Sequence, residues 1–293
     1  MSLRLLALLS ICAWGAGALV EPPAPSRFVH QDIRVIAHDG RYALAVGIVR
    51  PRGNGPFGAV ILNHGVGLDA ESRRVESPAQ LAHTAAEFAR RGYAVLMPLR
   101  RGFGATGGRF AEDPGSCAAP DFRRAEAEAA SDILEVVRFA RRLPYVDGAR
   151  IILAGQSAGG VASLYAAAQK PEGLVAVLAF AAGRGGNPGL RPGQPCGAER
   201  LGEVFAEMGR SVKAPVLLYY AENDGFFGPA TSRAWFLSFK AGGAKAEYVL
   251  WPAFGRDGHY LFSDPAGARA WVPAVEDFLG RHRIAFEAPK PAI

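Results

Sequence analysis

Residues 149–169 read ARIILAGQSAGGVASLYAAAQ, and they carry the clearest signal of the fold in the chain. The apolar run at its start predicts a buried strand that ends at Gly155, and the alanine-rich segment after it predicts a helix that begins at Ser157. The junction has the form G-x-S-x-G, with Gly155 and Gly159 on either side of the serine. In such a tight junction the serine is either a nucleophile held above the end of the strand or an incidental small residue. The stretch alone leaves both interpretations open.

Short apolar strands alternate with helical segments along most of the chain. This alternation predicts an α/β fold with a mostly parallel central sheet of about eight strands and helices on both of its faces. Residues 32–51 alternate apolar and polar side chains around Asp39-Gly40, which predicts a leading antiparallel hairpin. Residues 181–213 interrupt the alternation, and we predict that they form a small cap segment over one end of the sheet. The other strands are predicted at 58–65, 93–98, 174–180, 214–220 and 246–252, and the other helices at 78–92, 121–143, 229–243 and 267–282.

The N-terminus has the pattern of a secretory signal peptide. Arg4 precedes an apolar run of about 15 residues, and Ala16-Gly17-Ala18 fits a small-residue cleavage site. We therefore predict a signal peptide over 1–18, a single domain over 19–293, and a secreted or periplasmic protein with no stable membrane insertion after cleavage. An uncleaved anchor and a buried helix are the alternatives, although the run is shorter than the roughly 20 residues that cross a bilayer. Cleavage removes Arg4 and no acidic residue, so the net charge falls from +6 to +5.

The cysteines fit an exported protein. Cleavage removes Cys12 and leaves Cys117 and Cys196, an even number that allows one disulfide. Both lie in loops rich in glycine and proline, PGSCAAP and GQPCGAE, where packing alone provides little order. We predict a Cys117–Cys196 disulfide, and two unpaired buried thiols are the alternative.

Several other kinds of function are excluded. Arginines scattered beside glutamates indicate a solvated surface and no nucleic-acid partner, and we give the same interpretation to Arg184, with a contact to an acidic substrate as the alternative. Residues 102–107, GFGATG, match a dinucleotide-binding pattern, but Pro114 and Gly115 follow closely and no helix can begin there to bind a pyrophosphate. We expect no cofactor and no metal, and nothing in the sequence indicates an oligomeric state.

A nucleophilic serine needs a base and an acid that orients the base, and in this arrangement they follow in the order Ser, acid, His. Only His259 and His282 come after Ser157. His259 lies in the loop FGRDGHYLF after the last predicted strand, whereas His282 lies among arginines at the end of the last helix. His259 is therefore the predicted base.

The acid is expected in a loop that follows a core strand and precedes His259. The segment LLYYAENDGFFGP offers Glu222 and Asp224, and Asp224 is favoured because it lies deeper in the turn, next to Gly225. Asp257 is only two residues before His259, and we predict that it shapes the loop. The predicted triad is Ser157, Asp224 and His259.

Two backbone amides must stabilise the oxyanion of a tetrahedral intermediate. One is predicted at Ala158, directly after the nucleophile, and the other at Val66, in the loop that ends the strand ILNHGVG. His64 in the same loop precedes the serine in the chain. We predict that it braces the loop through hydrogen bonds, and a second base is the alternative.

With these residues in place, the chain resembles the α/β-hydrolase superfamily, most closely its dienelactone hydrolase-like branch, with some likeness to prolyl oligopeptidase-type and S15-type peptidases. The resemblance rests on LNHGVG, PLRRGFGATGG, LPYVDGARIILAGQSAGG, YAENDGFF and DGHYLF, which span roughly residues 30–282. It implies the triad and oxyanion roles given above. True dienelactone hydrolases use a cysteine nucleophile, and the serine at 157 makes simple ester hydrolysis the expected reaction in place of lactone hydrolysis.

The predicted function is therefore hydrolysis of a small-molecule carboxylic ester through an acyl-enzyme intermediate. Peptide-bond hydrolysis or acyl transfer by the same triad is the first alternative; peptidases of this type carry an additional propeller or β-domain for which the chain has no room. A non-catalytic binding module on a hydrolase fold is the second, but it would be expected to lack a triad member.

Overall fold

The computed structural model describes residues 27–286, so the predicted signal peptide lies outside the described residues. Within them, one sheet contains eight strands in the order β1-β2-β4-β3-β5-β6-β7-β8. β1 pairs antiparallel with β2 and β2 with β4, and all other neighbours are parallel. The predicted mostly parallel sheet with a leading antiparallel hairpin is confirmed.

The elements agree closely with the predicted alternation. The strands are β1 (Phe28–Ile36), β2 (Ala43–Pro51), β3 (Phe57–Asn63), β4 (Tyr93–Pro98), β5 (Val146–Gln156), β6 (Leu174–Phe180), β7 (Val216–Ala221) and β8 (Ala246–Trp251). The helices are α1 (Ala70–Arg74), α2 (Ala82–Arg90), α3 (Phe122–Ala140), α4 (Ala158–Ala168), α5 (Ala198–Ser211), α6 (Pro229–Ala241) and α7 (Ala268–Arg281).

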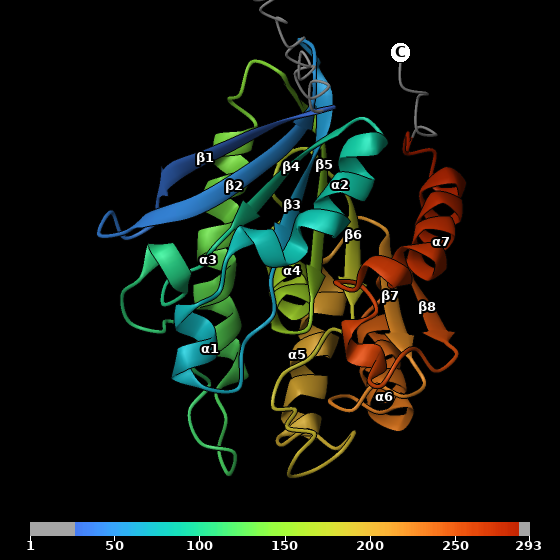
Figure 1. Cartoon of the computed structure of the whole chain (residues 1–293). Coiled ribbons are helices and arrows are strands. Elements are labelled where there is room, and N and C mark those ends of the chain that lie inside the picture. The colour runs from blue at the N-terminus through green and yellow to red at the C-terminus, as the bar shows by residue number, and fades with distance from the viewer. Residues whose placement is uncertain (1–26, 287–293) are drawn as a thin grey trace, which may run out of the picture.

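Helices cover both faces of the sheet, as Figure 1 shows. One core cluster joins the sheet to α3, α4, α5 and α6, and a second joins its other face to α2 and α7. The central strands are apolar along their whole length because both of their faces are buried in this arrangement. The two helix layers leave the carboxyl ends of the parallel strands accessible, and the loops that follow those ends carry the predicted site residues.

The segment 181–213 is only partly irregular, because α5 occupies its second half. The apolar side chains of α5 recur at helical spacing, and Leu201, Val204, Phe205 and Met208 are buried. Phe205 stacks on Trp235 of α6 with ring centroids 5.5 Å apart. This half of the segment thus belongs to the helix layer over the sheet, and the predicted cap function of the segment remains a prediction.

The glycine-rich stretch at 102–107 forms a loop with a single 3₁₀ turn at Gly104–Thr106. Gly102 and Gly107 both have positive φ, 92° and 63°, which a helix does not allow. No helix N-terminus is therefore available here to a pyrophosphate. None of the described helices is both long enough and apolar enough to cross a membrane.

Candidate active site

Ser157 lies at the sharp turn between β5 and α4. Its backbone has φ 58° and ψ −126°, a conformation that is unfavourable for a residue with a side chain. Close packing of the turn leaves no space for larger neighbours: a Cβ added to Gly155 would lie 2.4 Å from the carbonyl oxygen of Gly159. A Cβ at Gly159 would lie 2.3 Å from the carbonyl oxygen of His64. The two glycines are thus required by the geometry that places the serine hydroxyl above the sheet.

His259 and Asp224 form a buried pair beside this turn. The His259 Nδ1 lies 3.1 Å from Asp224 Oδ1 and 3.2 Å from Oδ2, and the two residues are only 4% and 3% exposed. Asp224 Oδ1 also accepts the backbone N–H groups of Phe226 and Phe227, at 2.8 and 2.9 Å, which fixes the carboxylate plane. The carboxylate is therefore oriented toward the Nδ1 edge of the imidazole, and Nε2 has no hydrogen-bond partner among residues 27–286.

The competing candidates lie elsewhere. Glu222 is exposed, although it is only two residues from Asp224. His282 lies 3.4 Å from Glu247 at the end of α7. Of the acid and base candidates considered from the sequence, the structure brings Asp224 and His259 together at the turn that holds Ser157.

Two residues fix the positions of the acid and base loops. Asp257 Oδ1 accepts the backbone N–H groups of Gly225 and His259, both at 2.9 Å, so it joins the two loops as a shaping residue. Gln156 Nε2 donates to the carbonyl oxygen of His259 at 2.6 Å. The function of Gln156 was not apparent from the sequence, because only its position next to the serine distinguishes it from a surface glutamine.

The loop after β3 lies against the serine. A Cβ added to Gly65 would lie 3.2 Å from the Ser157 Cβ, so this loop passes directly beside Ser157. The Val66 N–H makes no hydrogen bond within the described residues. The Ala158 N–H is the first of α4 and has no partner within the helix. Both amides are thus available to an oxyanion.

His64 is buried under the same loop and both of its ring nitrogens are occupied. Nδ1 lies 2.7 Å from the Gly65 carbonyl oxygen, and Nε2 accepts the Arg100 backbone N–H at 3.3 Å. Burial, with the nearby positive charge of Arg100, lowers the pKa of His64 to about 3. The imidazole is therefore neutral near pH 7 and has no free nitrogen with which to deprotonate Ser157.

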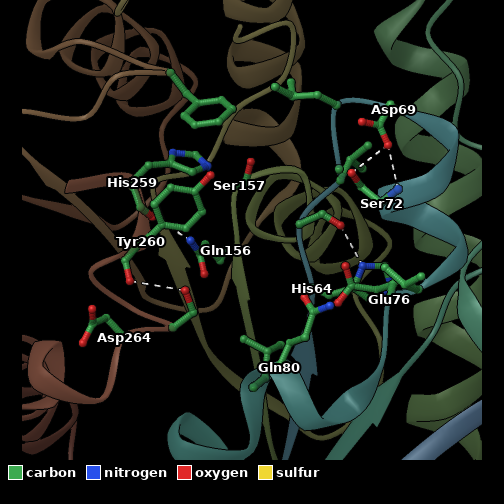
Figure 2. Close-up of a pocket in the computed structure, with 18 residues that line it drawn as sticks. His64, Asp69, Ser72, Glu76, Gln80, Gln156, Ser157, His259, Tyr260 and Asp264 are labelled. Atoms are coloured by element: carbon green, nitrogen blue, oxygen red, sulfur yellow. Dashed lines mark hydrogen bonds between the residues drawn. The ribbon is translucent and has the colours of Figure 1, made fainter. Parts of the chain in front are cut away.

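A cavity of about 750 Å³ opens in front of the serine. Figure 2 shows Ser157 and His259 close together on one side of it, with Asp69, Ser72 and Glu76 on the other side. Burial raises the pKa of Glu76 to about 7. Three large apolar side chains at this cavity remain strongly exposed: Leu68, Val75 and Tyr260, at 58%, 54% and 51%.

Aromatic side chains surround the imidazole. The Phe226 ring stacks on His259 with centroids 4.0 Å apart, and the Phe227 ring meets it edge-on at 5.3 Å. Phe226 and Tyr260 line the cavity, while Phe227 and Phe254 pack into the two core clusters. The apolar surroundings exclude water from the acid–base pair and strengthen their electrostatic interaction.

The two cysteines lie together, but as free thiols in this structure. Arg191 Nη2 lies 2.9 Å from the Cys117 sulfur. Hydrogen bonds from Cys196 and Arg191 lower the pKa of Cys117, whereas burial raises that of Cys196 to about 11. Their thiols interact, and the predicted disulfide itself remains a prediction. Among residues 27–286, no cluster of three His, Cys, Asp or Glu side chains has the arrangement of a metal site.

This fold, with a serine at the β5–α4 turn and the Asp224–His259 pair beside it, is the α/β-hydrolase fold. The chain belongs to the S15 family, described as X-Pro dipeptidyl-peptidase, whose model matches residues 39–199. The matched region includes Ser157 and ends before Asp224 and His259. None of the curated proteins matches the chain.

Solved structures with the same fold include both esterases and peptidases. A Klebsiella pneumoniae protein assigned as a dienelactone hydrolase has a TM-score of 0.61 and 18% identity, over 86% of this chain and 99% of its own. Acetyl xylan esterase 1 of Thermoanaerobacterium sp. JW/SL YS485 has a TM-score of 0.58 and 16% identity, over 88% and 85%. The acylaminoacyl peptidase of Pyrococcus horikoshii has a TM-score of 0.64 and 18% identity, over 92% of this chain and 43% of its own. At these identities the likeness establishes the fold.

Proposed function

We propose that this protein is a serine hydrolase that cleaves a carboxylic ester through an acyl-enzyme intermediate. The observation that carries the proposal is the buried Asp224–His259 pair, whose histidine lines the same cavity as Ser157. His259 accepts the proton of Ser157 as the serine oxygen attacks the ester carbonyl carbon. Asp224 holds the imidazole by its Nδ1–H and stabilises the imidazolium that forms.

The tetrahedral intermediate then breaks down as the protonated His259 gives its proton to the leaving group. The Val66 and Ala158 N–H groups hold its oxyanion, and His259 donates its proton to the departing alkoxide, which leaves the acyl group on Ser157. Water deprotonated by His259 attacks the acyl carbon and releases the acid with the serine regenerated. The apolar side chains exposed at the cavity favour substrates whose acyl or alcohol group is itself apolar.

A pair of serine variants tests this assignment. Ser157→Ala is expected to lower kcat for p-nitrophenyl acetate on the order of 10⁴-fold or more, because the serine and histidine act as one unit. Ser263 also lines the cavity and serves as the control, since its hydroxyl donates to the Tyr260 carbonyl oxygen and makes no other hydrogen bond with the described residues. Ser263→Ala is expected to retain activity. Near-normal hydrolysis by Ser157→Ala would refute the proposal.

Peptide-bond hydrolysis is the second candidate, and the match to the S15 family favours it. An ester needs only the triad and the oxyanion donors, because an alkoxide leaves more readily than the unprotonated nitrogen of a peptide bond. Comparing p-nitrophenyl esters of increasing chain length with Xaa-Pro p-nitroanilides separates the two reactions. A fluorophosphonate that fails to label Ser157 would instead support a non-catalytic binding module.

A further inference from the structure

The peptide group between Gly65 and Val66 determines where one proposed oxyanion donor points. This peptide is trans, so the Gly65 carbonyl and the Val66 N–H point in opposite directions within one plane. The Gly65 carbonyl oxygen lies 2.7 Å from His64 Nδ1. A bond that holds this carbonyl therefore also sets the direction of the Val66 N–H.

The bond requires a particular tautomer of His64, and Arg100 selects it. A backbone N–H can only donate, so the Arg100 N–H obliges Nε2 of His64 to be the unprotonated nitrogen. In a neutral imidazole the proton then resides on Nδ1, where it is donated to the Gly65 carbonyl. Arg100 also holds the backbone of the loop, because its Nη1 donates to the His64 carbonyl oxygen at 3.0 Å.

A buried chain of charges fixes the Arg100 side chain. Its Nε donates to Glu112 at 2.7 Å, Glu112 also pairs with Arg184, and Arg184 pairs with Glu126 of α3. These four residues are between 0% and 5% exposed, so Arg184 is not the solvated surface residue that the sequence predicts. Burial raises the pKa of Glu112, but Arg100 and Arg184 outweigh it and hold the pKa at about 2. Glu112 therefore stays ionised and keeps Arg100 in place.

We propose that His64 and Arg100 are positioning residues for the oxyanion: Arg100 fixes the tautomer and place of the His64 ring, and the ring aims the Val66 N–H. The inference rests on the proposed function, since it concerns the same tetrahedral intermediate. His64 touches no reacting atom and acts only through the loop.

Two amide variants of His64 test the inference. An asparagine amide can occupy the place of Nδ1 and keep the bond to Gly65, whereas a glutamine amide reaches the place of Nε2 and meets only Arg100. Loss of one oxyanion donor typically costs about 10²-fold in kcat. His64→Gln is therefore expected to lose about 10²-fold in kcat for p-nitrophenyl acetate with little change in KM, and His64→Asn less than about tenfold.

A second measurement distinguishes a misdirected Val66 N–H from a general disruption of the active site. Replacing the carbonyl oxygen of the ester by sulfur weakens its hydrogen bonds to the donors, so the ratio of ester to thionoester rates reports on them. The ratio is expected to fall in His64→Gln and to stay near the wild-type value in His64→Asn. Equal impairment of both variants, or a wild-type ratio in His64→Gln, would overturn the inference alone. Wild-type protein without Ser157-dependent hydrolysis would overturn the proposed function and this inference with it.

Discussion

Replacing Gly159 by alanine should disturb both the β5–α4 turn that carries Ser157 and the loop after β3 that carries Val66. The added Cβ would lie 2.3 Å from the His64 carbonyl oxygen and 2.4 Å from that of Asn63. Ordinary contact begins near 3.4 Å, so the backbones must separate by about 1 Å (3.4 − 2.3). Overpacking usually costs about 1–3 kcal/mol, and the upper value applies because backbone carbonyls cannot rotate away. The helix preference of alanine returns about 1 kcal/mol, which leaves a net loss of about 2 kcal/mol.

Urea unfolding and ester hydrolysis measure the two consequences. The free energy of unfolding should fall by about 2 kcal/mol, and kcat on the order of 10²-fold, because a displacement of about 1 Å misplaces the Val66 donor. Gly280 in α7 provides the matched control, since a Cβ there meets no atom within 4 Å. Gly280→Ala should raise stability by up to about 1 kcal/mol and leave kcat unchanged. A Gly159→Ala protein with wild-type stability and kcat would refute the packing argument.

Two further predictions concern His64 and the cysteines. The pKa of His64 is lowered from 6.5, its value in the unfolded chain, to about 3 in the folded state. The neutral ring therefore contributes fully to stability above pH 6.5, and this contribution is lost as the pH falls from 6.5 toward 3. From pH 7 to pH 5 this loss is about 2 kcal/mol; His64→Asn should abolish it, and the exposed His83→Asn should not. If the protein is exported and bonded as predicted, the intact mass of the mature protein should match a chain that begins after Ala18. That mass should rise by two hydrogens on reduction, whereas two alkylatable thiols at Cys117 and Cys196 would contradict the disulfide.

The sequence was sufficient to predict the sheet and the candidate triad because both leave local signals. The apolar strands and the glycines around Ser157 are such signals, and Asp224 and His259 follow from chain order and from their place after strands. The helix α5 was missed because glycines and prolines before residue 198 obscured its pattern, although Leu201 and Phe205 have helical spacing.

The buried charges could not be predicted, for a different reason. Glu112 and Arg184 are 72 residues apart in the chain, and a charged residue in a loop is ordinarily solvated. Only the fold brings them together. Gln156 is similar, since its partner His259 lies 103 residues away.

The four buried charged residues Arg100, Glu112, Arg184 and Glu126 are better explained by their effect on the position of Arg100 than by a contribution to the stability of the fold. A buried ion pair gains little over well-packed apolar residues, because desolvation offsets most of the attraction. The two ends of this chain of charges also differ: one buried carboxylate oxygen of Glu126 has no hydrogen-bond partner in the described part of the chain, and burial raises the pKa of Glu126 to about 7. At the other end Arg100 binds both Glu112 and the His64 carbonyl. The hydrogen-bonding groups of these four charged residues are thus best satisfied at Arg100, next to the loop that carries Val66. This is the end at which the placement of side chains affects the proposed chemistry.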